Sequence, residues 1–156
     1  MPKFTFKSSG LSVTYTRVPR KLLEEFSLQH KKRLYPKPPV QTLEVSGEKV
    51  SEENVSDPEY QQAIQVYNLR FGVDLNRFIV KRAVKEFDIE AVRRLREETI
   101  GELELPQDDV IVFVYFIAAI DDAEVWELAD AVLSKSQVSE EGTAAQVATF
   151  QGDVQR

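Results

Sequence analysis

The stretch SDPEYQQAIQVYNLRF, residues 56–71, decides the fold because it predicts where the helical part of the chain begins. Asp57 can cap a helix whose first residue is Pro58, since aspartate accepts hydrogen bonds from free backbone N–H groups and proline is tolerated in the first turn. Aromatic and aliphatic side chains then recur at i, i+4, i+7 and i+11 on one helical face: Tyr60, Ile64, Tyr67 and Phe71. The stripe indicates either the protein's own core or a partner-facing surface.

Upstream of this helix, residues 35–57 are predicted to form an extended strap. The strap opens with Tyr35, Pro36, Pro38 and Pro39, which are typical of a polyproline II segment that serves as a spacer or binds an aromatic-lined groove. Its apolar content is low, so whether it can order itself depends on the free energy gained by burial compared with the free energy lost on ordering. Burying its five aliphatic side chains contributes roughly 7–15 kcal/mol, whereas ordering about twenty residues costs on the order of 20–40 kcal/mol.

The strap nevertheless contains one signal for local order. Leu43 and Val45 alternate with polar residues just before Ser46-Gly47. This pattern suits a local hairpin or a strand added to another sheet, either of which would recover backbone hydrogen bonds.

Residues 1–34 predict a β-hairpin followed by a short helix. Apolar residues alternate with polar ones on both sides of Ser8-Ser9-Gly10, and Gly10 is free to adopt a positive φ. Pro19 fits the start of a helix that carries Leu22, Leu23 and Phe26 on one face.

Beyond residue 71, Gly72 and Asp74 predict a break followed by a second helix that runs to Phe87. Asp88 predicts the start of a third, highly charged helix. The run Val110–Ile120 suits a buried strand or a buried helix, and its Ala118-Ala119 pair favours the helix. Further helices are predicted after Asp121 and after Ser139, the latter with Phe150 as an anchor.

The expected fold is therefore mainly α, in the α+β class. It comprises an N-terminal β-hairpin and short helix (1–34), an extended Pro-rich strap (35–57), a helical domain holding a bundle of about five helices (58–150) and a polar tail (151–156).

Composition narrows the function classes. The chain of 156 residues has no cysteine, which excludes disulfides and thiolate chemistry. Its net charge of −6 is unevenly spread, with +7 on residues 1–39 and −13 on residues 40–156. The opening MPKFTFKSSG lacks the apolar core of a signal peptide, and the longest apolar run has eleven residues where a membrane span needs about 20. We expect a soluble, cytoplasmic protein with no membrane association.

No catalytic, cofactor-binding or metal-binding residue is expected. The single histidine, His30, adjoins Lys31, Lys32 and Arg33, which repel a metal cation and disfavour the charged imidazole. The pairs Asp108-Asp109 and Asp121-Asp122 are typical of helix caps rather than of a divalent-cation cage. These neighbouring basic residues suit the C-terminus of a helix. The net negative charge of the rest of the chain argues against nucleic-acid binding.

Several segments together resemble a known family. They are FTFKSSGLSVTYTRVP, the strap YPKPPVQTLEVSGEKVSEENVSDPEY, the run DVIVFVYFIAAIDDAEVWELADAVL and the close SQVSEEGTAAQVATFQGDV. Their order resembles tail assembly chaperones and related tail-module proteins of long-tailed bacteriophages and prophages. The resemblance spans most of the chain, but it is one of layout and not of a sharp motif.

The resemblance implies a non-enzymatic protein that binds the tape-measure protein or tail-tube subunits in the bacterial host cytoplasm during virion morphogenesis. The alternatives are a structural component of the tail or head–tail joint that stays in the virion, and a small regulatory or host-interaction protein. Self-association into a homo-oligomer is left open. The expected partner-binding residues are Tyr35, Pro36, Pro38, Pro39, Leu43, Val45, Tyr60 and Tyr67.

Overall fold

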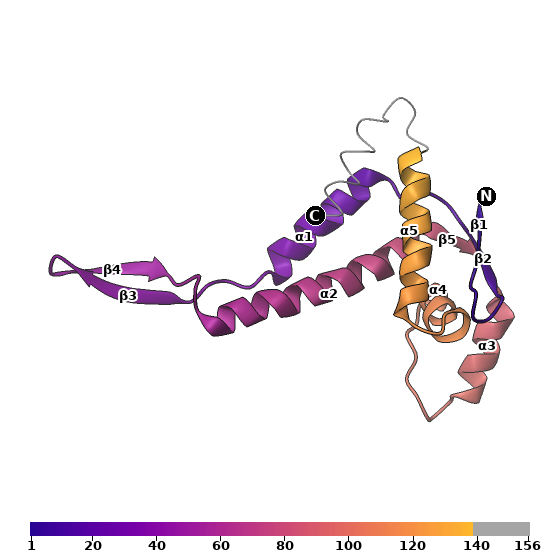
Figure 1. Ribbon diagram of the computed structural model, residues 1–156. Helices are drawn as coiled ribbons and strands as arrows, with labels where there is room; N and C mark the ends of the chain where they lie inside the picture. The colour runs from indigo at the N-terminus through magenta and orange to yellow at the C-terminus, as the bar shows by residue number, and fades with distance from the viewer. Residues whose placement is uncertain (139–156) are drawn as a thin grey trace. The chain divides into compact units, whose positions relative to one another are not determined.

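The computed structural model describes residues 1–138 (Figure 1), so the helix predicted after Ser139 and the polar tail lie outside the described residues. The chain divides into two compact units. Unit 1 comprises residues 1–23 and the chain from Asn76 onward, and unit 2 comprises residues 24–75. The boundaries between the two units fall within helices α1 (Arg20–Leu34) and α2 (Pro58–Ala83). The class is α+β, as predicted.

Unit 1 contains a three-stranded antiparallel sheet of order β1-β2-β5. Strands β1 (Lys3–Thr5) and β2 (Ser12–Tyr15) pair with one another through a turn in which Gly10 has φ +74°. Strand β5 (Val84–Glu86) pairs with β2. The prediction that the second helix continues to Phe87 is therefore wrong. Residues 84–86 instead form a strand that completes a sheet with β2, some seventy positions earlier in the sequence.

Helices cover the core of unit 1. They are α3 (Ile89–Glu98), α4 (Asp109–Val112), the π-helix η1 (Phe113–Ala118) and α5 (Asp122–Val138). Phe87 and Phe113 pack with ring centroids 5.4 Å apart. The largest fully buried side chains of unit 1 are all apolar, and most of them come from the sheet, α2 and the helices that follow it: Phe6, Val13, Val18, Ile79, Val80, Val92, Val112, Phe113, Val114, Val125 and Leu128.

The run Val110–Ile120 is helical, as its alanine pair favoured, but most of it is a π-helix. The Ala119 N–H donates to the Val114 carbonyl oxygen at 3.1 Å, which is the i→i−5 bond of that helix type. Asp108 caps α4 by accepting from the N–H groups of Val110 and Ile111 at 2.9 and 3.2 Å. Asp108 therefore acts as the cap that was predicted.

Unit 2 contains most of α1 and of α2. Helix α2 runs unbroken through Gly72, so the predicted break there is wrong. A single glycine costs a helix only about 1 kcal/mol, and Asp74, expected to cap a new helix, is instead bonded to His30 of α1. The predicted cap Asp57 does begin the helix, since its Oδ2 accepts from the Tyr60 N–H at 3.0 Å.

Residues 40–53, predicted as part of an extended strap, instead form the β-hairpin that was the local alternative. Strand β3 (Val40–Val45) pairs antiparallel with β4 (Glu48–Glu53) in an unbroken register. The turn residues Ser46 and Gly47 have φ of +55° and +81°. Two positive φ values in a two-residue loop match the type I′ turn, whose twist suits paired strands, so local backbone geometry supplies the order.

Candidate interaction surface

A buried histidine joins α1 to α2 in unit 2. His30 is 2% exposed, and its Nε2 lies 2.8 Å from Asp74 Oδ2 while its Nδ1 lies 3.2 Å from the Tyr67 hydroxyl. The Asp74 carboxylate accepts a hydrogen bond from an Nε2–H, and Nδ1 shares a hydrogen bond with the Tyr67 hydroxyl, which can donate or accept. Both ring nitrogens are satisfied, so this histidine holds two helices together.

Aromatic rings surround this histidine. The ring of Phe71 lies 5.2 Å from the imidazole, centroid to centroid, and that of Phe26 lies 5.6 Å away. Burial raises the pKa of Tyr67, with Tyr35 as a second cause. The predicted stripe on α2 is therefore at least partly the core of unit 2, because Tyr67 is buried.

Tyr35, Tyr67 and Tyr60 adjoin one another at the end of α1. The Tyr35 ring packs edge-on against the Tyr67 ring at 5.0 Å, and the ammonium of Lys31 lies over the Tyr35 ring at 5.1 Å. The pKa of Tyr60 is raised by partial burial first, then by Tyr35 and by the Glu53 carboxylate. The raised pKa values of Tyr60 and Tyr67 favour the neutral forms of these two phenols.

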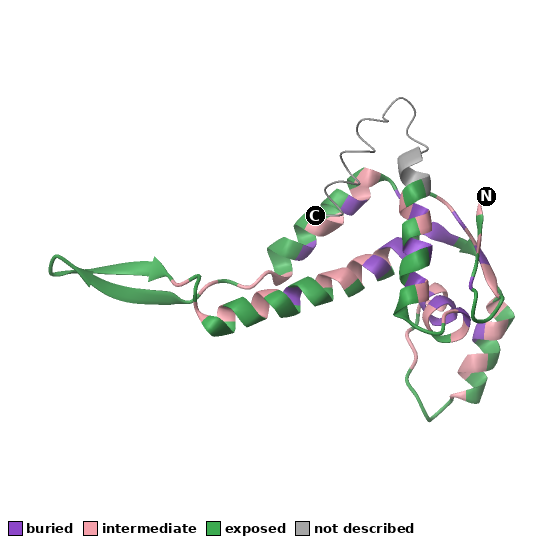
Figure 2. Cartoon of the chain, in the orientation of Figure 1, coloured by how far each residue is buried: buried purple, intermediate pink, exposed green. Residues whose placement is uncertain are grey.

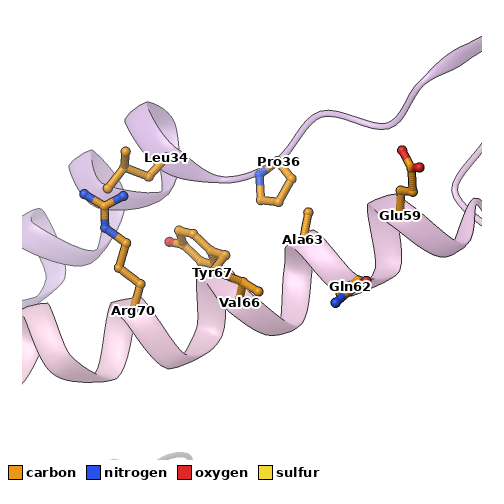
Figure 3. Close-up of a pocket in the computed structure, with 8 residues that line it drawn as sticks. All are labelled: Leu34, Pro36, Glu59, Gln62, Ala63, Val66, Tyr67 and Arg70. Carbon is orange, nitrogen blue, oxygen red and sulfur yellow. The ribbon is translucent and has the colours of Figure 1, made fainter.

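An open groove of about 440 Å³ lies next to these rings. Figure 3 shows Pro36 facing Ala63 and Tyr67 across the groove, with Glu59 and Arg70 towards its two ends. Its lining is mostly apolar along the middle and charged at the ends: Leu34, Pro36, Glu59, Gln62, Ala63, Val66, Tyr67 and Arg70. The groove therefore suits an apolar segment with polar flanks.

The hairpin is exposed on both faces (Figure 2). Residues that pair directly across two strands point to the same face, and successive pairs alternate between faces. Leu43 pairs with Val50 and Val45 pairs with Glu48, so these four share a face with the Gln41–Glu52 pair. We call Leu43, Val45 and Val50 the apolar face. Its Val50 is 45% exposed and its Val45 is 56% exposed, so the described chain leaves it largely uncovered.

A second apolar stripe on α2 faces solvent. Val66, Leu69 and Val73 are spaced i, i+3, i+7 and are 58%, 75% and 48% exposed. This stripe was not predicted, although its helical spacing can be read from the sequence. The burial of His30 was not predicted either, because its partner Asp74 is 44 positions away.

The expected partner-binding residues separate into two places. Pro36 and Tyr67 line the groove, and Tyr35 packs against Tyr67 beside it. Leu43 and Val45 lie on the exposed apolar face of the hairpin. The remaining three lie between or beside these places: half-buried Tyr60 in the first turn of α2, and Pro38 and Pro39 in the connector to β3.

The acids of unit 1 stabilise helix ends and the sheet turn. Glu124 accepts from Ser8 N–H, the Ser8 hydroxyl and Ile120 N–H at 2.9, 2.6 and 2.7 Å. These bonds, the Ser8 hydroxyl first, hold the pKa of Glu124 below its usual range. Within residues 1–138, no three acidic or histidine side chains are grouped to hold a metal ion. Over the same residues, no helix has the length and apolarity needed to cross a bilayer.

Comparison with protein-family models, with curated proteins and with solved structures finds no match to this chain.

Proposed function

We propose that this chain is a non-enzymatic tail assembly chaperone of a long-tailed phage or prophage, which binds the tape-measure protein or tail-tube subunits in the host cytoplasm. The observation that carries the proposal is the hairpin β3–β4, a two-stranded element with an apolar face that the described chain leaves exposed. The order of segments along the chain, which resembles that family, supplies the identity of the client.

The physical argument starts from the marginal stability of such a hairpin. Two strands without a third strand or a covering helix are barely stable in water, because they bury little apolar surface. Unpaired strand edges also invite pairing with another chain. A hairpin of this kind is stabilised when an apolar partner segment covers it, and an aggregation-prone client supplies such segments.

Unit 2 offers a second surface of the same chemistry. The stripe Val66, Leu69 and Val73 gives a helical contact, while the Pro-rich residues 35–39 and the hairpin form an arm that reaches around a client. Glutamates beside the apolar face, Glu48 and Glu52, keep the protein and its complex soluble by their charge.

The test is co-expression with the tape-measure protein encoded in the same tail module, scored by the soluble fraction of that client. We expect the full chain to keep the client soluble and a variant with residues 41–52 replaced by a short Gly-Ser linker to rescue it weakly. Both variants should show the same circular dichroism transition for the helices. Full rescue by the linker variant would reduce the hairpin to a connection, and no rescue by either would remove the chaperone function.

A matched pair of substitutions locates the binding surface more finely. Leu43→Thr with Val45→Thr and Val50→Thr removes the apolar face and places β-branched threonine, which suits strands, at all three positions. Val40→Thr with Thr42→Ser alters the opposite face and serves as the control. We expect lost rescue only with the first set.

A second function, a structural component of the tail or head–tail joint, is favoured by the free edges of the hairpin, which suit lateral pairing with a neighbouring subunit. Mass spectrometry of purified particles separates the two. Stoichiometric presence in mature virions would support the structural role and contradict a pure chaperone.

A further inference from the structure

We propose that the hairpin β3–β4 of one copy docks in the groove of a second copy of this chain, giving a head-to-tail contact. The proposal does not rest on the chaperone function, since it concerns the purified chain alone. It follows from three observations within unit 2: matching apolar surfaces, opposite charges and a connector that directs the hairpin away from its own groove.

The two apolar surfaces match in chemical kind. The groove is walled by Leu34, Pro36, Ala63, Val66 and Tyr67 and has a volume of about 440 Å³. The apolar face of the hairpin presents only aliphatic side chains, and they are contiguous because Leu43 and Val50 pair directly across the strands. Aliphatic side chains entering such a groove remove apolar area from water on both partners.

The charges are complementary. Residues 40–53 carry four glutamates and one lysine, a net charge of −3. The groove residues Leu34 and Pro36 are flanked in sequence by exposed cations, which we call the basic cluster: Lys31, Lys32, Arg33 and Lys37. Arg70 lies at one end of the groove, with Glu59 as the acid at the other. Acidic strands and a basic-flanked groove attract each other and orient the contact.

The connector favours the trans arrangement. Pro36 lines the groove and β3 begins at Val40, so three residues separate the two. Pro38 and Pro39 stiffen this connector, and the hairpin base is closed by the Asn54 N–H donating to the Pro39 carbonyl at 2.8 Å. Each strand then extends about 20 Å from that base. The apolar face is thus carried away from its own groove, and a second copy supplies the groove that it fills.

The two surfaces differ, so the contact is heterologous. Such a contact generates a closed ring if the rotation closes and an open chain if it does not. It also protects the strand edges and apolar face that a free hairpin leaves open to aggregation.

The test is sedimentation of the purified chain, in which charge reversal is applied to each side of the contact. The hairpin reversal is Glu48→Lys with Glu52→Lys and Glu53→Lys. None of these residues pairs across the strands with Lys49, so the hairpin register is not strained. The cluster reversal is Lys32→Glu with Arg33→Glu and Lys37→Glu, which leaves the Lys31–Tyr35 contact in place.

We expect the wild-type mass to rise with concentration from micromolar to millimolar and to fall with added salt. Each reversal should weaken association by about tenfold or more, since like charges then face each other. An equimolar mixture of the two reversals should associate again, because each variant then supplies the charge that the other lacks.

Two further variants control the result. Glu98→Lys with Glu102→Lys and Glu104→Lys makes the same charge change on exposed residues of unit 1 and should associate as wild type does. Threonine at Leu43, Val45 and Val50 should abolish association without any charge change, which keeps the proposal testable if a reversal fails to fold. A wild-type chain that stays monomeric throughout, or a mixture that does not associate, would overturn the proposal.

Discussion

The described residues 1–138 contain two β-hairpins with opposite surroundings. In β1–β2, the strand residues Val13 and Tyr15 and the adjoining Phe6 are buried, and β5 adds a third strand. In β3–β4, all twelve strand residues are exposed, and within residues 1–138 no third strand joins them. Alternating apolar residues thus form paired strands in both places, but in the described part of the chain only the first hairpin packs against other elements. The difference identifies β3–β4 as the element that another chain is expected to complete.

The largest effect on stability is expected from truncating a buried side chain that adjoins the hairpin β1–β2. Phe6 is fully buried, so Phe6→Ala should lower the free energy of unfolding by about 3–5 kcal/mol, through lost burial and the cavity left behind. Urea unfolding followed by circular dichroism measures it. Leu43→Ala on the other hairpin is the matched control and should change that free energy by less than about 1 kcal/mol. Equal losses would abolish the distinction between the hairpins.

The second effect concerns the helices that carry the exposed hairpin. His30→Ala removes a buried ring and leaves Asp74 and the Tyr67 hydroxyl without that partner, so a loss of about 3 kcal/mol is expected. Lys32→Ala, on the exposed side of the same helix, is the control. A near-neutral His30→Ala would mean that the two helices do not depend on this contact.

The third effect is pH-dependent and concerns the turn of the packed hairpin. The pKa of Glu124 is lowered in the folded protein. The ionised carboxylate therefore stabilises the fold at pH values above the ordinary pKa of glutamate, and this stabilisation is lost as the pH falls through the lowered pKa. Glu124→Gln should lower the Tm at neutral pH and flatten the acid limb of the Tm–pH curve. An unchanged acid limb would show that the Ser8–Glu124 bonds do not hold the turn.

The smallest effect is expected on the exposed hairpin itself. Val50→Thr keeps a β-branched side chain on a half-exposed site, so stability should change by no more than about 0.5 kcal/mol. Client rescue should nevertheless weaken, because the apolar face loses its central side chain. A large loss of stability with intact rescue would assign Val50 to the fold rather than to binding.

Local signals carried most of what the sequence predicted correctly. Asp57, Asp88 and Asp108 cap the helices that follow them, because capping depends on three or four neighbouring residues. The positive φ values at Gly10 and Ser46-Gly47 likewise arise within tight turns.

Non-local contacts account for what the sequence did not predict. The His30–Asp74 contact joins residues far apart in sequence, so the residues around His30 gave no signal of its burial. Residues 84–86 extend a helical stripe in sequence but pair with β2 in space. The strand pattern of Leu43 and Val45 could be predicted because these residues alternate locally with polar ones, whereas the groove is formed by Pro36 together with residues of α2.

Amide hydrogen exchange of the two hairpins tests the central claim most directly, that β3–β4 is ordered by a partner and β1–β2 by its own chain. In the isolated protein, below the concentration at which it associates, we expect the paired amides of β3–β4 to be at least about 100-fold less protected than those of β2. They should gain protection when the client or a second copy binds. Equal protection of both hairpins in the isolated chain would contradict the account.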